Sequence, residues 1–313
     1  MPALKPARRI EGISAVLLPF DAADRPDWSS FQSLLERTWS AGLTPAVNMD
    51  TGYVNLLSAA ERIRVLDETK RVAAGRPFVA GAFIEGESGE PAMAYRRAID
   101  LIRSKAGTPI LFQGSALHRL DDAGVVDLYA RVGEAGGPLL GFELGSMFAP
   151  FGRIYSEDVF RRLLDVPAFT GLKHSSLDRE QEWRRLEIRD RHRPEFKLYT
   201  GNDLAIDMVF YGSDYLLGLS AFHVDAFAER DRRWAAGDSR AWTLNDLLQY
   251  LGQIAFRPPV PAYKHSAAQF LKLRGAIATD RPHPKSPTRP GSDVAILDDV
   301  RMRIEMEMTR ANG

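Results

Sequence analysis

Short apolar runs alternate along the chain with longer segments in which apolar and polar positions are mixed. The apolar runs are nearly continuous, which is typical of parallel strands buried on both faces. Eight of these runs are predicted as strands, over residues 13–20, 43–50, 77–85, 109–114, 138–145, 168–175, 196–202 and 215–222.

The mixed segments between these runs predict helices. Ser58 and Glu61 have the spacing of a capping box, which marks a helix start. Ser156 precedes two acidic residues, a pattern that favours a helix N-terminus. Eight strand–helix units before residue 236 predict a (β/α)₈ TIM barrel, an α/β fold. A doubly wound open sheet is the structural alternative.

The pattern changes after residue 236, where helical segments follow one another without strands. Two such segments and a Pro-rich loop precede a last helix, whose apolar positions include Leu297, Val300 and Ile304. We expect residues 1–236 to form the barrel with a short N-terminal arm, and residues 237–313 to form a C-terminal helical extension.

Composition and charge narrow the class of protein. The chain is 45% hydrophobic and 26% charged, with a formal net charge of zero, so no nucleic-acid or membrane partner is expected from bulk electrostatics. No apolar run approaches the length of a membrane span, and no signal peptide is indicated. The absence of cysteine excludes disulfides and thiol catalysis. The cytoplasm is the expected location.

The carboxyl ends of the strands are where a barrel places its active site. Polar side chains gather at these predicted ends. They are Asn48, Asp50, Thr51, Glu85, Gln113, Ser115, Glu143, Lys173, His174, Ser175, Tyr199, Thr200, Asn202, Ser220 and His223.

Lys173 is the most specific of these candidates. Only 8 of the 41 basic residues are lysines, and a lysine, unlike an arginine, can lose its proton when it is desolvated. A neutral amine can attack a carbonyl carbon and form a Schiff base. The alternative is a structural lysine paired with Asp50 or Glu143.

Three segments resemble motifs of the dihydrodipicolinate synthase / N-acetylneuraminate lyase family. They are "MDTGYVNLLSAAER" (49–62), "GLKHSS" (171–176) and "YTGNDLAIDMVFYGSDYLLGLSAF" (199–222). The resemblance covers roughly residues 10–275. It implies a class I, Schiff-base-forming lyase on a (β/α)₈ barrel with extra C-terminal helices. It also implies that Lys173 forms the Schiff base and that the protein is a homodimer or homotetramer.

The chain departs from this family at two important positions. Asp50 stands where the family has the first of two hydroxyl residues, and only Thr51 keeps its hydroxyl. Phe142 stands where the family has a tyrosine that relays protons. Tyr155 and Tyr199 are candidate replacements for this phenol.

Two further positions have alternative orientations. Glu143 follows Phe142, and only one of the two can face the barrel interior. His174 follows Lys173, so we expect His174 to form hydrogen bonds between sheet and helices. The turn after the predicted fifth strand carries an arginine in the family. This turn is longer here, so the guanidinium of Arg153 need not reach the place of the family's arginine.

The sequence thus predicts a lyase of aldolase or dehydratase type that acts on a small keto acid, sugar acid or aldehyde. The expected catalytic residues are Lys173, Asp50 and Glu143, and the expected substrate-binding residues are Thr51, Asn48, Phe142, Gln113 and Ser220. No cofactor and no metal are expected. One alternative is a barrel that lost its chemistry and binds a small molecule. Another is a metal-assisted lyase, with Asp50, Glu85, Glu143 and His223 as possible donors.

Overall fold

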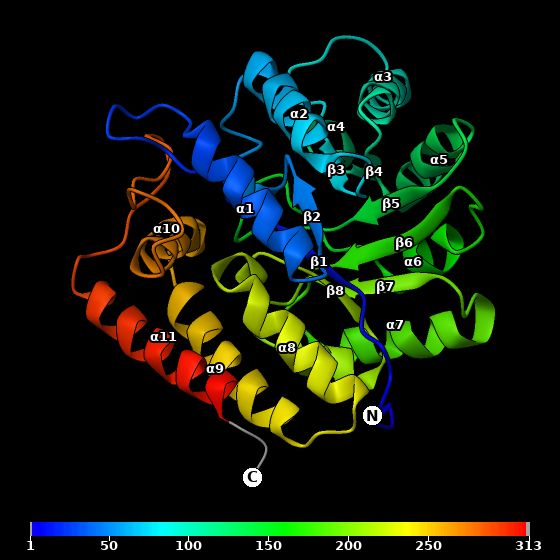
Figure 1. The fold of residues 1–313 in the computed structure, drawn as a ribbon. Helices are drawn as coiled ribbons and strands as arrows, with labels where there is room; N and C mark the ends of the chain where they lie inside the picture. Colours follow the sequence, from blue (N-terminus) through cyan, green and yellow to red (C-terminus); the bar gives the residue numbers. More distant parts are fainter. Residues whose placement is uncertain (1, 311–313) are drawn as a thin grey trace.

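The structure, a computed structural model, describes residues 2–310. Eight parallel strands close into a barrel in the order of the chain (Figure 1). The barrel closes where β1 pairs with β8, Ile13 lying opposite Leu216. The predicted (β/α)₈ fold is confirmed and the open sheet is wrong. The strands are β1 (Gly12–Ala15), β2 (Thr44–Val47), β3 (Val79–Ala82), β4 (Thr108–Leu111), β5 (Leu139–Phe142), β6 (Phe169–His174), β7 (Lys197–Thr200) and β8 (Asp214–Leu217).

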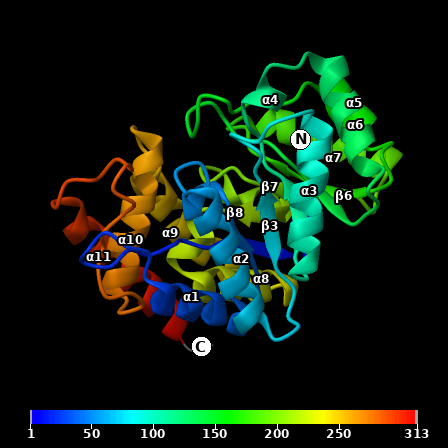
Figure 2. The same ribbon diagram turned by 90° about the horizontal axis from the view of Figure 1, so that it is seen from above.

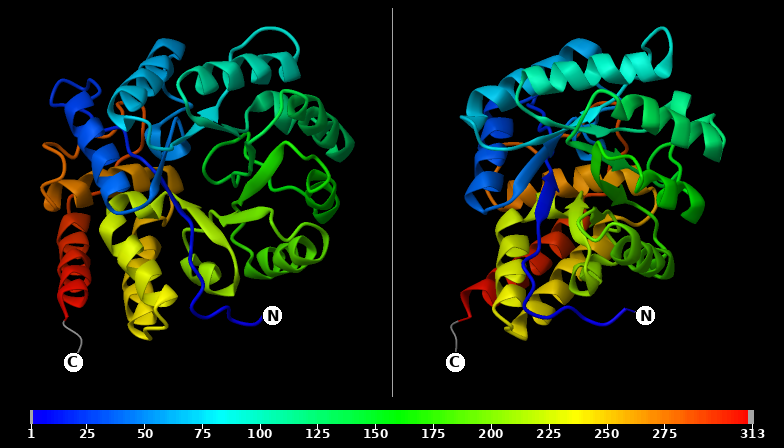
Figure 3. Two further views of the ribbon diagram at one scale, coloured as in Figure 1. Left: turned by 45° about the vertical axis from the view of Figure 1, so that its right-hand side comes forward. Right: turned by 90° about the vertical axis from the view of Figure 1, so that its right-hand side faces the viewer.

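Helices follow the strands and surround the barrel (Figure 3). They are α1 (Trp28–Ser40), α2 (Ala59–Ala73), α3 (Pro91–Ser104), α4 (Ser115–His118), α5 (Asp122–Gly133), α6 (Glu157–Leu163), α7 (Arg179–His192) and α8 (Val224–Ala235). Short 3₁₀ helices lie at η1 (Asp50–Gly52), η2 (Ile206–Tyr211), η3 (Leu219–Phe222) and η4 (Val260–Ala262).

Local capping signals explain where several of these helices begin. Ser58 and Glu61 form the complete capping box at the start of α2, as the sequence predicts. The Ser156 side chain accepts the Val159 N–H at the start of α6. These bonds satisfy N–H groups that have no partner inside the helix.

Three more helices lie beyond the barrel: α9 (Arg240–Ala255), α10 (Tyr263–Leu273) and α11 (Asp293–Thr309). α9 packs against α8, and α11 packs against α9 and α10. Leu297, Val300 and Ile304 of α11 are buried in this contact. Figure 2 shows these helices on one flank of the molecule, away from α5 and α6. The division of the chain after residue 236 stays a prediction.

The barrel interior holds its own apolar cluster, separate from the larger core between sheet and helices. Near the carboxyl end of this interior, the rings of Phe112 and Phe142 stack with centroids 4.3 Å apart. Phe142 therefore faces inward. Since neighbouring strand residues face opposite sides, Glu143 faces the helices. This packing sets the floor of the candidate site.

Candidate active site

Lys173 lies near the carboxyl end of β6, and its side chain enters the barrel. Its Nζ donates a hydrogen bond to Ser175 Oγ at 2.9 Å and lies 4.8 Å from the centroid of the Phe142 ring. Burial lowers the pKa of Lys173 to about 8, while the nearby carboxylates of Asp203 and Asp50 act in the opposite direction. A substantial fraction of this amine is therefore neutral near physiological pH.

A cavity of about 20 Å³ lies beside Lys173, large enough for about one water molecule. Most of its wall is apolar and aromatic. The lining residues are Ala15, Met49, Asp50, Thr51, Phe142, Leu144, Phe148, Lys173, Asp203, Leu216, Gly218 and Tyr263. The structure thus brings together four of the predicted residues: Lys173, Asp50, Thr51 and Phe142.

Asp50 is held by two side chains of the C-terminal helix α10. Lys264 Nζ donates to Asp50 Oδ1 at 3.0 Å, and the Tyr263 hydroxyl donates to Asp50 Oδ2 at 2.8 Å. The same hydroxyl lies 2.9 Å from Thr51 Oγ1. All four residues are buried. Lys264 therefore balances the negative charge that Asp50 brings into the site.

Asp203 is a second carboxyl group in the cavity. Burial raises its pKa to about 7, although the Leu219 N–H and the positive charge of Lys173 act to lower it. The Leu219 N–H lies 2.8 Å from Asp203 Oδ1. The pKa of Asp203 lies close to that of Lys173. The two groups therefore each shift the protonation of the other.

Glu143 lies on the other side of the sheet from Lys173. It is fully buried, and it accepts hydrogen bonds from Arg185 Nη1 at 2.7 Å and from the Tyr155 N–H at 2.7 Å. His174 Nδ1 lies 3.0 Å from Glu143 Oε2. The structure does not bring Glu143, expected as a catalytic residue, to the cavity. His174 forms hydrogen bonds between sheet and helices, as the sequence predicts.

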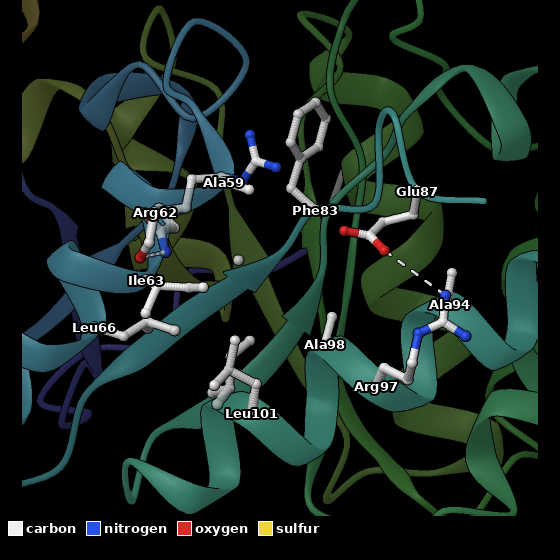
Figure 4. A pocket seen from close by; sticks show the side chains of 13 residues that line it. Ala59, Arg62, Ile63, Leu66, Phe83, Glu87, Ala94, Arg97, Ala98 and Leu101 are labelled. Carbon is white, nitrogen blue, oxygen red and sulfur yellow. Dashed lines mark hydrogen bonds and ion pairs between the residues drawn. The ribbon is translucent and has the colours of Figure 1, made fainter.

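Asn48 does not line the Lys173 cavity either. It belongs to a groove of about 150 Å³ outside the barrel, between α2 and α3 (Figure 4). Its Nδ2 donates to the Arg62 carbonyl at 3.0 Å. The figure shows Ile63 and Leu66 facing Ala98 and Leu101 across this groove. The backbone of Asn48 has a positive φ of 51°.

Gln113 and Ser220 support neighbouring segments. Gln113 exchanges two hydrogen bonds with the backbone of Arg153, at 2.8 and 2.9 Å. Ser220 Oγ donates to Ser14 Oγ of β1 at 2.8 Å. The guanidinium of Arg153 binds Asp122 and the Leu120 carbonyl. It is therefore engaged away from the cavity.

The possible metal donors have other partners. Glu85 accepts the N–H and hydroxyl of Ser115, both at 2.8 Å, and His223 Nδ1 accepts the Ala226 N–H. Within residues 2–310, no group of three or more His, Asp or Glu side chains has an arrangement that would hold a metal ion. Over the same residues, no helix is long and apolar enough to cross a bilayer.

Sequence reasoning missed three residues at this site: Asp203, Tyr263 and Lys264. Asp203 follows the predicted seventh strand directly, so its position at a strand end was the available signal. Tyr263 and Lys264 belong to a helix after the barrel. Their sequence position gives no sign that they reach Lys173, because the path of α10 depends on tertiary packing.

Comparisons with known proteins give a structural match only. No family model matches the sequence, and no curated protein sequence matches it significantly. Dihydrodipicolinate synthase from Thermotoga maritima has a TM-score of 0.79 at 16% identity, covering 96% of this chain and 100% of that one.

Two further solved structures were determined with pyruvate. Dihydrodipicolinate synthase from Acinetobacter baumannii has a TM-score of 0.78 at 19% identity, covering 95% of this chain and 99% of that one. A prophage protein of the dihydrodipicolinic acid synthase family from E. coli K12 has a TM-score of 0.80 at 16% identity, covering 95% and 98%. The chain therefore has the (β/α)₈ fold of the dihydrodipicolinate synthase family.

Proposed function

We propose that the protein is a divergent member of this family and a lyase, of aldolase or dehydratase type, that forms a Schiff base on Lys173. The observation that carries the proposal is a buried lysine at the carboxyl end of β6, with a pKa lowered to about 8 and a cavity beside its amine. Its substrate is a small keto acid, sugar acid or aldehyde.

The chemistry follows from the neutral amine. The Lys173 ammonium gives its proton to solvent, and the neutral amine attacks the carbonyl carbon of the substrate. The hydroxyl of this adduct takes up a proton from solvent and departs as water, which leaves an iminium in which the substrate carbon is bonded to Nζ. The iminium attracts electrons, so an adjacent C–C, C–O or C–H bond can break. The face of the Phe142 ring, 4.8 Å from Nζ, favours the positive charge of the iminium.

Charges around the cavity support a substrate with at most one carboxylate. Asp50 would repel a substrate carboxylate on its own, but Lys264 at 3.0 Å compensates it. Thr51 places a hydroxyl at the cavity wall, beside the substrate. No guanidinium is among the residues that line the cavity in the described part of the chain. A second carboxylate would therefore remain without a charged partner.

Borohydride trapping tests the proposal. The protein is incubated with pyruvate, keto sugar acids and aldehydes, reduced, and analysed by intact-mass and peptide mass spectrometry. We expect a carbonyl-dependent mass increase on Lys173, lost in Lys173→Ala and Lys173→Arg. Lys197→Ala is the matched control, because Lys197 lies at the other end of a barrel strand and pairs with Asp214. A folded protein that no carbonyl labels would contradict the proposal.

A small-molecule binding protein without lyase activity is the second candidate. It is favoured by Phe142, which cannot supply the proton that the family's tyrosine supplies. Under this alternative, a carbonyl compound or its reduced analogue would stabilise the protein against heat without labelling Lys173. The trapping experiment and a thermal-shift measurement on the same compounds therefore separate the two candidates.

The proposal includes a homodimer or homotetramer, as the family resemblance implies, and a cytoplasmic location, as the cysteine-free sequence favours. Light scattering coupled to size-exclusion chromatography measures the mass of the particle in solution. A mass of one chain would contradict this part of the proposal without affecting the chemistry.

A further inference from the structure

We propose that Tyr263, on the C-terminal helix α10, is the phenol that relays protons in the Lys173 site. Protons pass from the substrate to Thr51, then to Tyr263, then to Asp50. This inference rests on the proposed Schiff-base function. It assigns the relay to a residue outside the eight strand–helix units of the barrel.

The hydrogen bonds of Tyr263 form a continuous path. Thr51 lines the cavity beside Lys173, its Oγ1 lies 2.9 Å from the Tyr263 hydroxyl, and that hydroxyl lies 2.8 Å from Asp50 Oδ2. These distances are those of good O–H···O hydrogen bonds. Each hydroxyl can give one proton while it accepts another.

The Tyr263 ring is fixed in position. It is 2% exposed and stacks on Phe256 with centroids 4.3 Å apart and planes 17° apart. Burial and the neighbouring Asp50 carboxylate raise the pKa of Tyr263 well above its ordinary value. The phenol therefore stays protonated at neutral pH. It relays a proton by accepting one from Thr51 while it gives its own to Asp50.

The other candidate phenols point elsewhere. Tyr155 binds Tyr129 behind the sheet, with 3.1 Å between the hydroxyls, and Tyr199 binds Glu11 at the start of β1, at 2.8 Å. Among the described residues that line the cavity, Tyr263 is the only tyrosine. It thus supplies the group that is missing at Phe142.

Lys264 completes the relay by compensating its terminal carboxylate. Its Nζ binds Asp50 Oδ1 at 3.0 Å, which leaves Oδ2 for the phenol. Lys264 is 3% exposed, so this ion pair is largely shielded from solvent. The adjacent residues Tyr263 and Lys264 therefore hold the two oxygens of one carboxylate.

The proton transfer balances in charge and atoms. A C–H bond next to the iminium breaks, and its electron pair forms the C=C bond of an enamine while the C=N bond becomes C–N. The proton goes to Thr51 Oγ1, the Thr51 proton goes to the Tyr263 oxygen, and the Tyr263 proton goes to Asp50 Oδ2. The iminium loses its positive charge and Asp50 loses its negative charge. Reversal of these steps returns the proton.

Deuterium exchange into pyruvate tests this step without the complete reaction. Wild type and variants are incubated with pyruvate in D₂O, and NMR follows the loss of methyl protons, while borohydride trapping measures the imine. We expect Tyr263→Phe, which keeps the ring stacked on Phe256, to trap pyruvate as wild type does. Its exchange per trapped imine should be lower by about 10²–10⁴-fold.

Further variants separate a relay from a structural role. Thr51→Val should lose exchange and Thr51→Ser, which keeps the hydroxyl, should restore it. Tyr199→Phe is the matched control, because it also removes a buried hydroxyl bound to a carboxylate and should exchange at the wild-type rate. Circular dichroism and thermal unfolding check that each variant is folded.

The outcomes distinguish this inference from the proposed function. Equal exchange by Tyr263→Phe and wild type overturns the relay, and so does wild type that traps pyruvate without exchanging it. If pyruvate is not trapped, 2-oxobutanoate or another trapped carbonyl with an α-hydrogen takes its place. If none is trapped, the Schiff-base function fails and the relay fails with it.

Discussion

At the residue scale, burial acts differently on two charged groups of the molecule. Lys173 and Glu143 are both buried next to β5 and β6, yet their environments differ. The hydrogen-bond partner of Lys173 is a hydroxyl. The nearby carboxylates favour the charged amine, but burial has the larger effect and favours the neutral amine. Glu143 has Arg185 at 2.7 Å, and this positive charge favours the ionised form. Burial thus favours the neutral form of Lys173, whereas Arg185 favours the ionised form of Glu143.

The pH dependence of imine formation follows from the lowered pKa of Lys173. We expect the initial rate of trapping with pyruvate to rise with pH and to level off above about pH 8, because the amine loses its proton there. An ordinary lysine would gain reactivity up to about pH 10.4. Quenched borohydride reactions between about pH 6 and about pH 10 measure this profile.

Asp203→Asn refines the same measurement. The Asp203 carboxylate acts to raise the pKa of Lys173, so its removal should lower that pKa and move the plateau to lower pH. A rate that continues to rise beyond the ordinary lysine pKa, in wild type or variant, would show that Lys173 is not desolvated in solution.

Glu143→Gln should destabilise the protein by about 3–5 kcal/mol, because Arg185 would then be a buried charge without its carboxylate partner. The free energy of unfolding in urea measures this effect. Burial alone would raise the pKa of Glu143, but Arg185 and His174 outweigh it and lower the pKa to about 2. The stabilisation is therefore complete above about pH 4.5 and is lost as the pH falls towards 2.

Glu182→Gln is the control for this prediction. Glu182 is equally buried, but the hydroxyls of Thr200 and Ser213 hold it instead of a direct ion pair. Burial raises its pKa, so a neutral amide should cost less there. Equal destabilisation by both variants would contradict the role given to Arg185. Loss of Lys173 trapping in folded Glu143→Gln would indicate that Glu143 acts in the reaction after all.

At the scale of elements, the segment between β5 and α6 forms part of the cavity wall. Gln113 anchors one end of this segment through its two bonds to the Arg153 backbone. Gly152 packs so closely that a Cβ would lie 2.6 Å from the Leu144 carbonyl oxygen. Before these fixed points in the same segment, Phe148 lines the cavity, and its ring centroid lies 6.1 Å from that of Tyr263. The segment thus connects the barrel with α10.

Phe148→Ala should admit larger carbonyl compounds, because it removes a half-buried ring from the cavity wall. We expect trapping of phenylpyruvate, relative to pyruvate, to increase by about tenfold or more. Competitive labelling with both compounds, read by mass spectrometry, measures the ratio.

Phe151→Ala serves as the comparison for the Phe148 variant. Phe151 belongs to the same segment but packs on Phe83, with centroids 6.0 Å apart, and it does not line the cavity. The ratio of phenylpyruvate trapping to pyruvate trapping should therefore stay at the wild-type value. A similar change in both variants would mean that the whole segment, rather than the Phe148 ring, limits access.

At the scale of the whole molecule, the barrel and the C-terminal helices form one site. The strands supply Lys173 and Phe142. The segments after the strands supply Asp50, Thr51 and Asp203, and α10 supplies the two side chains that bind the Asp50 carboxylate. α9 and α11 support α10 through their packing. A boundary after residue 236 therefore separates two parts of the sequence that share the candidate active site.

Local patterns along the chain determined the fold and the candidate residue Lys173. Continuous apolar runs and capping signals such as Ser58 with Glu61 are short-range features. They sufficed for eight strand–helix units, and the strand-end position then singled out Lys173. The inward position of Phe142 could only be stated as one of two alternatives, because the sequence does not fix which face of β5 lines the barrel.

Only the tertiary structure decided which charges meet at the site. It paired Asp50 with Lys264, more than two hundred residues away in sequence, and it paired Glu143 with Arg185 behind the sheet. These contacts depend on how helices pack on the closed barrel. Residues far apart along the chain have no local pattern that links them. The phenol of Tyr263 was unpredictable for the same reason: its place beside Thr51 is set by the packing of α10 against the barrel.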